Sequence, residues 1–402
     1  IGGRKTACAK GAGMGSDFDR VINRSGTHCV KWDHHEMRDE VESMIPMSIA
    51  DMDFEASGFV IDAMVERARH GVFGYTIVPD SYYSSLAAWI GRRFSWPVKR
   101  EWIRFTPGVI PALGFAVQAF TEPGDKVVIQ PPVYHPFRHS IANNGRVVLN
   151  NPLRSWGGCY RMDIDGLKKA IDSRTRMIIL SNPHNPVGRV WTREELAALV
   201  EVCLENGMLV ISDEIHSDLV MPGFAHTPTA SLSEEAARIT VTCTSPSKTF
   251  NLAELHVANI IIPDYDLFAR FEAALARAGL NRPNVMGMAA AEAAYSKGDG
   301  WVNELVQYLH GNYIIMRGFF EERLPEVKVS PMEGTYLAWL DFREFGVADA
   351  ALEDMLLRKA RVAMTPGRVF GPGGEGFFRM NLACPRATLE EALRRIEGAM
   401  RG

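Results

Sequence analysis

The sequence has few of the features that mark a membrane, secreted or nucleic-acid-binding protein. No apolar run approaches the roughly 20 residues that span a bilayer, and the first segment, IGGRKTACAKGAGMGSDF, has no apolar core of the kind found in a secretion signal. Basic residues number 44 against 48 acidic ones, which gives a net charge of -4 without any basic tract. We therefore expect a cytoplasmic protein whose direct partners include neither nucleic acid nor a membrane surface.

The sequence also lacks the cysteine and histidine spacing of a metal site. Its six cysteines are scattered without a C-x-x-C pair, which predicts reduced thiols and no structural zinc. The stretch DHHE at 33–36 is not expected to hold a metal, because adjacent histidines on a strand or turn rarely share one ion. GAGMGS at 11–16 and GPGGEG at 371–376 superficially resemble phosphate loops. Neither follows a strand and opens a helix, so both are predicted to be loops.

What the sequence does have is a regular alternation of short β-branched runs and segments with helical periodicity between about residues 60 and 300. This alternation predicts an α/β fold with a mostly parallel seven-stranded sheet and helices on both faces. The expected strands are IRFTPG, KVVIQPP, RVVLNN, RMIILSNP, MLVISDE, RITVTCT and ANIIIP. We predict a flexible segment over 1–15, an N-terminal segment over 16–60, a large domain over 61–299 and a smaller α+β domain over 300–402, on which the N-terminal segment packs.

Polar residues follow four of the expected strands. Because ligands bind at the carboxyl ends of the strands in such sheets, these residues are expected to share one site. Lys248 can form a Schiff base if its amine is desolvated, and Asp213 can pair with a pyridinium nitrogen. Gly108 opens a helix whose first N–H groups can bind an anion. The strand ends present Asn182, His184 and Asn185, then Asp213 and Glu214, then Ser245, Ser247 and Lys248, and finally Gly108.

Each of these residues has an ordinary interpretation when it is taken alone. A single lysine is usually a surface charge, and an aspartate that ends a strand is more often a turn or cap residue. Their occurrence together on successive strand ends favours pyridoxal 5'-phosphate as the cofactor, since this molecule needs a lysine, an acid at its ring nitrogen and a phosphate site.

The motifs resemble those of a known family. The chain is similar to fold-type I pyridoxal-phosphate enzymes of the aspartate aminotransferase superfamily, and within it to the MalY/PatB cystathionine β-lyase-like class. The similarity runs in family order from about residue 18 to 402. The segments that carry it are FDRVINRSGTHCVKWD, IPMSIADMDF, FGYT, TPGVIPAL, PPVYHPF, SNPHNPVGRVW, SDEIHSDLV, SPSKTFNLA, AAEAAYSKGDGW, EGTYLAWLDF and FRMNLACPR.

The resemblance implies a role for individual residues. Lys248 matches the lysine that binds the cofactor covalently and then removes the Cα proton of the substrate. Asp213 matches the partner of the pyridine nitrogen, and Arg379 matches the arginine that binds the substrate carboxylate. Ala50 and Asn185 match further substrate-binding residues, and Tyr134 and Tyr75 match catalytic ones. Tyr75 is implied to reach the site of a neighbouring subunit and to bind the cofactor there. The other cofactor-binding matches are Asn185, Tyr134, Val109, Ile110, Ser245, His216 and His256.

Other interpretations remain open for several of these residues. Tyr134 is also compatible with a core aromatic residue, His216 with a capped helix residue, and Arg379 with a surface ion pair. In addition, Glu254 stands where the family has glycine and His256 where it has arginine or glutamine. These two departures bring a negative charge and only a weak positive charge towards the expected phosphate site.

The resemblance implies a homodimeric carbon–sulfur β-lyase. Such an enzyme converts cystathionine or another cysteine S-conjugate, an amino acid with a β-thioether, into a thiol, pyruvate and ammonia. A second hypothesis is an aminotransferase, which needs a keto-acid acceptor and releases no thiol. A third is a regulatory protein that acts through protein contacts.

Overall fold

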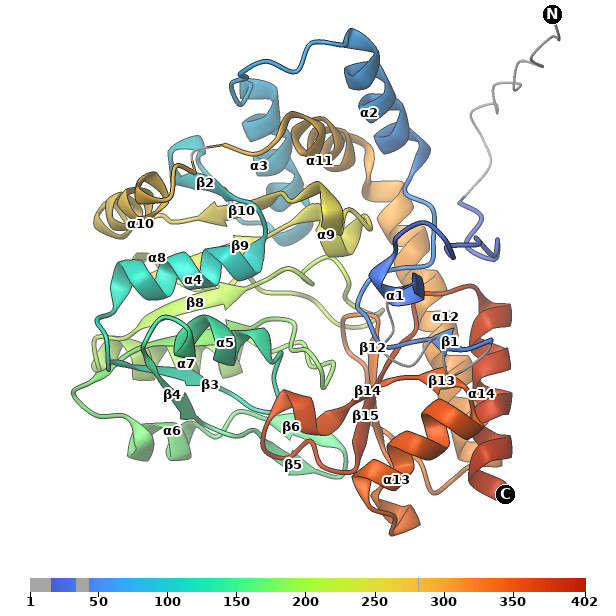
Figure 1. Ribbon diagram of the computed structural model, residues 1–402. Coiled ribbons are helices and arrows are strands. Elements are labelled where there is room, and N and C mark those ends of the chain that lie inside the picture. Colours follow the sequence, from blue (N-terminus) through green and yellow to red (C-terminus); the bar gives the residue numbers. More distant parts are fainter. Residues whose placement is uncertain (1–15, 34–42, 281) are drawn as a thin grey trace, which may run out of the picture.

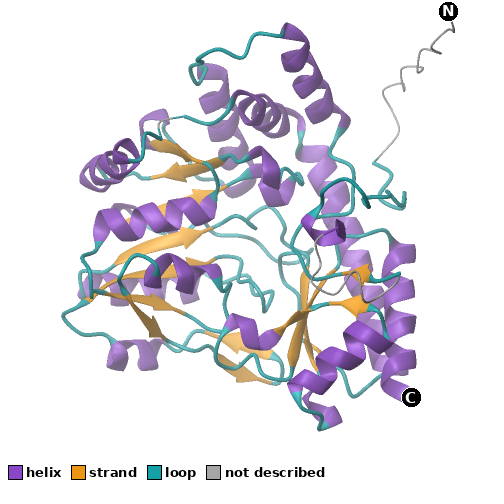
Figure 2. Cartoon of the chain, in the orientation of Figure 1, coloured by secondary structure: helices purple, strands orange, loops and turns teal. Residues whose placement is uncertain are grey.

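The computed structural model describes residues 16–33, 43–280 and 282–402, which form a seven-stranded sheet with helices on both sides and a smaller four-stranded sheet beside it (Figures 1 and 2). The helices are α1 (Val30–Asp33), α2 (Gly58–His70), α3 (Asp80–Phe94), α4 (Val109–Phe120), α5 (Pro136–Ala142), α6 (Ile164–Ala170), α7 (Arg193–Glu205), α8 (Glu234–Ile239), α9 (Pro246–Thr249), α10 (Tyr265–Arg277), α11 (Val285–Lys297), α12 (Asp299–Arg323), α13 (Asp349–Asp354) and α14 (Arg386–Arg401).

The large sheet has the strand order β2-β10-β9-β8-β7-β3-β4. Strand β10 is antiparallel to both of its neighbours, β2 and β9, and the other pairs are parallel. All strands except β10 therefore point in one direction. The seven strands are β2 (Ile103–Thr106), β3 (Lys126–Ile129), β4 (Val147–Asn150), β7 (Thr175–Ser181), β8 (Leu209–Asp213), β9 (Thr240–Thr244) and β10 (Ala258–Ile261).

Both faces of the large sheet are buried, because successive side chains of a strand point to opposite faces. In β7, Met177 and Ile179 pack in the core cluster that contains residues of α4, α5 and α10. Ile178 and Leu180 pack in the other cluster, with residues of α6 and α7. Helix α7 begins with a capping box, in which the Thr192 side chain accepts from the Glu195 N–H and Glu195 accepts from the Thr192 N–H.

The four-stranded sheet is antiparallel, with the order β11-β12-β15-β14, and α12 packs against α14 next to it. The N-terminal strand β1 pairs with β13, so a segment from the start of the chain lies against this part (Figure 1). The strands are β1 (Ile45–Pro46), β11 (Lys328–Val329), β12 (Leu337–Asp341), β13 (Val362–Ala363), β14 (Thr365–Pro366) and β15 (Phe377–Asn381), and β5 (Arg154–Trp156) and β6 (Cys159–Arg161) form a separate hairpin.

The seven predicted runs are the seven strands of the large sheet, which confirms that prediction. In the smaller part, α13 ends at Asp354 and the chain continues as a π-helix over Met355–Lys359. The stretches 34–36 and 11–15, on which the metal interpretation and one phosphate-loop interpretation fall, lie outside the described residues. The second phosphate-loop stretch, GPGGEG at 371–376, forms turns, as predicted for a loop. Within the ranges that the structure covers, no helix is long and apolar enough to cross a membrane, and no three His, Cys, Asp or Glu side chains are grouped as metal ligands.

Candidate active site

The carboxyl ends of β7, β8 and β9 meet at one edge of the large sheet. Strand β7 ends at Ser181 and β8 at Asp213, and β9 leads through Ser245 into the short helix α9 that carries Lys248. The Ser245 hydroxyl accepts a hydrogen bond from the backbone N–H of Ser247 (3.1 Å) and caps α9. The sheet thus places the carboxyl of Asp213 and the amine of Lys248 on adjacent strand ends.

The Lys248 amine is held by a backbone carbonyl. Its Nζ donates to the carbonyl oxygen of Ala50 (2.6 Å), which also accepts from the hydroxyl of Tyr336 (2.9 Å). Burial and the charge of Arg379 together lower the pKa of Lys248 to about 8, against the opposing charges of Asp51 and Asp213. Near neutral pH a useful fraction of the amine is therefore unprotonated, as a nucleophile or base requires.

Burial of the Lys248 amine should lower the free energy of unfolding of the protein. Below pH 8 the amine is protonated in both states, and its drop in pKa from 10.5 to about 8 costs the folded state about 3 kcal/mol. Above pH 10.5 the cost disappears, because the amine is neutral in both states. We expect Lys248→Met to raise the free energy of unfolding of the ligand-free protein by about 3 kcal/mol at pH 7 and by progressively less between pH 8 and 10. Urea unfolding at several pH values measures this, and a gain that does not change with pH would contradict it.

Asp213 and His216 lie close to the Lys248 side chain and line the same cavity. Burial raises the pKa of the Asp213 carboxyl to about 7, although the Ile215 N–H, 3.2 Å from its Oδ1, opposes the shift. Burial lowers the pKa of His216 to about 3, so its imidazole is neutral. The ring of His216 packs edge-on against Tyr336, and its Nδ1 has no partner among the described residues. A buried carboxyl with a raised pKa is suited to sharing a proton with a nitrogen base.

A cavity of about 140 Å³ lies between these groups. Gly108, with φ of 135°, turns the chain from β2 into α4, so that the first residues of the helix face the cavity. The positive end of α4 makes this wall suited to an anion. The cavity is lined by Ala50, Val109, Ile110, Tyr134, Ser181, Asn185, Asp213, Ile215, His216, Ser247, Lys248 and Ala253.

Arg379 lies in β15 at the border of a second, larger cavity of about 470 Å³. Its guanidinium donates to Asn185 Oδ1 (3.0 Å) and to the carbonyl oxygen of Ser48 (2.7 Å). The side chain is buried, its Nε has no partner, and none of the described residues offers it a carboxylate. Burial lowers the pKa of Arg379 to about 10, so it stays charged near neutral pH. This arrangement favours a binding site for a carboxylate.

The larger cavity shares Ala50, Tyr134 and Lys248 with the smaller one. Much of the remaining wall is apolar and comes from the π-helix and the strands that follow it. Its further lining residues are Ser48, Ile49, His135, Glu353, Leu356, Leu357, Val362, Ala363, Met364, Thr365, Pro366, Phe378 and Arg379. The two cavities therefore meet at the Lys248 amine.

Some residues of the predicted site do not line either cavity. The Ser245 hydroxyl donates to the carbonyl oxygen of Val257 (2.6 Å), and Ser247 lines the smaller cavity instead. The Nε2 atom of His256 lies 3.3 Å from a carboxylate oxygen of Glu254, whose side chain is 91% exposed. The Nδ1 atom of His256 lies 3.3 Å from the carbonyl oxygen of Pro107, at the turn before α4. Tyr75 is fully exposed.

The sequence did not point to Tyr336, whose hydroxyl donates to the carbonyl oxygen of Ala50 beside the Lys248 amine. Tyr336 belongs to the matched segment EGTYLAWLDF and directly precedes the buried strand β12. This position is the feature of the sequence that could have indicated its place near the site. Ser247 lies next to Lys248, but the hydroxyl of Ser245 was the one expected at the phosphate site.

The chain matches the family Aminotransferase class I and II over residues 42–396, and it belongs to this family. The fold is that of fold-type I enzymes, as predicted. Within the curated proteins, it is 48% identical to cystathionine β-lyase PatB of Bacillus subtilis strain 168, over 96% of this chain and 100% of the relative. It is 33% identical to protein MalY of Escherichia coli K12, over 96% and 99% of the two chains.

Two solved structures have the same fold over almost their whole length. Cystalysin of Treponema denticola, which contains pyridoxal 5'-phosphate, superposes with a TM-score of 0.94 at 36% identity, over 96% of this chain and 99% of that one. The pyridoxal-phosphate-bound C–S lyase of Staphylococcus hominis superposes with a TM-score of 0.89 at 30% identity, over 97% and 99%. These matches confirm the resemblance to the MalY/PatB class.

Proposed function

We propose that this protein is a pyridoxal-phosphate-dependent carbon–sulfur β-lyase that cleaves cystathionine or another cysteine S-conjugate. The observation that carries the proposal is the meeting of two cavities at the Lys248 amine, one bordered by Asp213 and the start of α4, the other by Arg379. The similarity to a cystathionine β-lyase over the whole length of that relative supports the same reaction.

The residues of the smaller cavity fit pyridoxal 5'-phosphate. Asp213 offers a buried carboxyl to the ring nitrogen, and Asn185 has an amide that can reach the ring oxygen. The backbone N–H groups of Val109 and Ile110 open α4 and suit the phosphate. Tyr134 offers an aromatic face for stacking on the ring. The exposed side chain of Glu254 is paired with His256, which leaves the start of α4 free to bind the phosphate.

In the reaction, Arg379 binds the α-carboxylate of the amino acid, and the Lys248 amine removes the proton from its Cα. When bound, the cofactor withdraws electrons from this carbon. Loss of the thiolate from Cβ then leaves a product that hydrolyses to pyruvate and ammonia. The larger cavity holds the substituent on sulfur, and the neutral imidazole of His216 keeps additional positive charge away from Lys248.

The deciding experiment measures pyruvate released from L-cystathionine by the purified protein, with added pyridoxal 5'-phosphate and without a keto acid. We expect pyruvate, free thiol and ammonia in equal amounts. S-methyl-L-cysteine serves as a second substrate with a smaller sulfur substituent. If neither substrate gives pyruvate, but amino-group transfer appears once a keto acid is added, the protein is an aminotransferase and the proposal is wrong.

We propose that the protein is a homodimer in which Tyr75 completes the site of the partner. The segment around Tyr75 exposes several large apolar side chains, which are Val72, Phe73, Tyr75 and Ile77. An apolar surface of this kind is typical of an interface. Tyr75 does not line the cavities of its own chain, so a role at the phosphate requires a second copy.

For this dimer, we expect Tyr75→Phe to weaken cofactor binding by on the order of 10-fold, because one hydrogen bond to a charged group is lost. Titration of the visible cofactor absorbance measures this affinity, and sedimentation measures the mass. Tyr265→Phe is the matched control, since Tyr265 is also exposed. A monomer with full cofactor affinity would contradict the prediction.

We also propose that the chain divides into a large cofactor-binding domain over 61–299 and a small domain over 300–402, with the described residues of the segment 16–60 packed on the small domain. The separate seven-stranded and four-stranded sheets and the pairing of β1 with β13 support this division. The cysteines of the described residues are free thiols, which supports a reducing, cytoplasmic location.

A further inference from the structure

Two cations of the proposed site are held by one short segment, residues 48–53, here called the carbonyl segment. Arg379 donates to the carbonyl oxygen of Ser48 (2.7 Å), and Lys248 donates to that of Ala50 (2.6 Å). Lys248 lies in α9, beside the large sheet, and Arg379 lies in β15 of the four-stranded sheet, yet both bind carbonyls that are two residues apart. The position of this segment therefore sets the positions of the amine and the guanidinium relative to each other.

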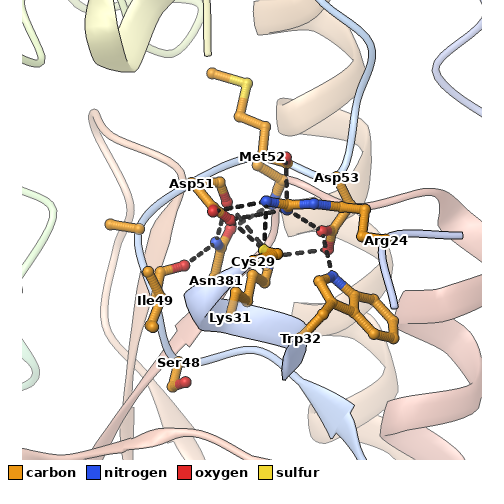
Figure 3. Close-up of polar contacts among 12 residues, drawn as sticks. Arg24, Cys29, Lys31, Trp32, Ser48, Ile49, Asp51, Met52, Asp53 and Asn381 are labelled. Atoms are coloured by element: carbon orange, nitrogen blue, oxygen red, sulfur yellow. Dashed lines mark hydrogen bonds and ion pairs between the residues drawn. The ribbon is translucent and has the colours of Figure 1, made fainter. Parts of the chain in front are cut away.

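An ionic cluster fixes the carbonyl segment from one side (Figure 3). Its members are Arg24, Lys31, Asp51 and Asp53. The guanidinium of Arg24 lies between the two carboxylates, with Nη1 2.6 Å from Asp53 Oδ1 and Nη2 2.8 Å from Asp51 Oδ2. It also donates to the carbonyl oxygen of Met52 (3.0 Å). Lys31 Nζ lies 2.7 Å from Asp53 Oδ2.

The ionic cluster is largely buried, so the positions of its charges affect the position of the carbonyl segment. Lys31 and Asp53 are only 2% and 4% exposed, so their charges are weakly screened and need each other. Trp32 adds a hydrogen bond from Nε1 to Asp53 Oδ1 (2.8 Å). Removing Arg24 leaves Lys31 as the remaining cation for both Asp51 and Asp53. We expect the segment to move or to admit water in response to this loss of charge compensation.

Two asparagines tie the carbonyl segment to β15 and to the turn after α9. Asn381 of β15 donates to the carbonyl oxygens of Ile49 and Asp51, both at 2.6 Å. Asn251, in the turn after α9, accepts from the N–H of Met52 (3.0 Å) and donates to its carbonyl oxygen (2.9 Å). These contacts connect the ionic cluster rigidly to the elements that carry Arg379 and Lys248.

We propose that Arg24 and Lys31 are positioning residues of the active site, which act through Asp51 and Asp53 to hold the carbonyls that bind Arg379 and Lys248. They touch neither cavity and are not catalytic residues. The inference rests on the proposed function for the roles of Lys248 and Arg379. It goes beyond that function because it makes an N-terminal ionic cluster a determinant of the reaction geometry.

The test compares Arg24→Met with Arg24→Lys in the holoenzyme. We expect Arg24→Met to lower kcat/KM for pyruvate release by on the order of 10- to 100-fold, since small displacements of reacting groups have effects of this size. Its visible cofactor absorbance should change in position or in pH dependence. Arg24→Lys keeps the charge but cannot bridge both carboxylates, and it should recover part of both signals.

Arg20→Met is the matched control, because Arg20 pairs with Glu55 just beyond the carbonyl segment and both side chains are about half exposed. It should leave kinetics and absorbance unchanged. If Arg24→Met lowers only the melting temperature while kinetics and absorbance stay as in the wild type, the cluster is merely structural and the proposal is wrong.

A second variant covers the case in which Arg24→Met does not fold. Asp51→Asn keeps the backbone contacts of the carbonyl segment and the Arg24–Asp53 pair, and it should change kcat/KM and absorbance in the same way as Arg24→Met. Unchanged values in folded Asp51→Asn would also overturn the inference. If the wild type itself releases no pyruvate, the proposed reaction fails, and the absorbance of the variants still decides the positioning role.

Discussion

Lys248→Ala is expected to abolish measurable pyruvate release, with kcat falling by a factor on the order of 10⁴. In the proposed function, the residue supplies both the covalent attachment of the cofactor and the base for the Cα proton, and general base catalysis alone contributes up to about this factor. The visible absorbance of the bound cofactor should also change, because its bond to the protein is lost. Pyruvate assays and absorption spectra of the purified variant measure the two effects.

Lys297→Ala is the control for this variant, because Lys297 ends α11 and lies outside both cavities. It should retain wild-type turnover and absorbance. Unfolding measurements should show that Lys248→Ala is at least as stable as the wild type, since the costly buried amine is gone. Residual turnover within 10-fold of the wild type would contradict the assignment of Lys248 as the catalytic base.

Arg379→Met is expected to lower kcat/KM by on the order of 100- to 1000-fold, with much of the effect in KM. If Arg379 binds the substrate carboxylate as proposed, the substitution leaves that carboxylate in a buried site without its cation, and losses of this kind cost about 3 to 4 kcal/mol. The uncharged Asn185 amide and the Ser48 carbonyl, which now bind the guanidinium, cannot replace it. Steady-state kinetics with L-cystathionine measures the change.

Arg379→Lys tests the geometry separately from the charge. Lysine keeps the positive charge but cannot form the planar two-point contact, so it should recover only part of the loss. Arg343→Met, which removes an exposed arginine that pairs with Asp341, should have no effect on KM. An unchanged KM in Arg379→Met would show that the substrate carboxylate binds elsewhere.

The seven strands of the large sheet could be predicted because most of them are buried on both faces and are largely apolar runs, although the edge strand β4 is partly exposed. The hairpin of β5 and β6 could not, since Arg154–Trp156 is exposed throughout and has no apolar alternation. The π-helix after Asp354 also gives no signal in the sequence. Its residues have ordinary helical periodicity, and packing decides the local geometry.

The candidate site was predictable where a polar side chain lies at or shortly after the end of a strand, as Asp213 and Lys248 do. It was not predictable where the contact is made by a backbone carbonyl, because the carbonyl of Ala50 is the same in every residue type. The pairing of Arg24 with Asp51, 27 residues further along, likewise depends on how the chain folds back. Propensity and spacing do not describe contacts of this kind.

The two cavities have a practical consequence for engineering this enzyme. The smaller one is bordered mainly by residues from 109 to 253, whereas most of the apolar wall of the larger one comes from residues 356–366. A mutant library restricted to Leu356, Leu357, Val362 and Met364 would therefore leave Lys248 in its present surroundings. Directed evolution towards bulkier or smaller leaving groups can accordingly begin in one short stretch of the chain. Substitutions there can change substrate selectivity without weakening cofactor binding.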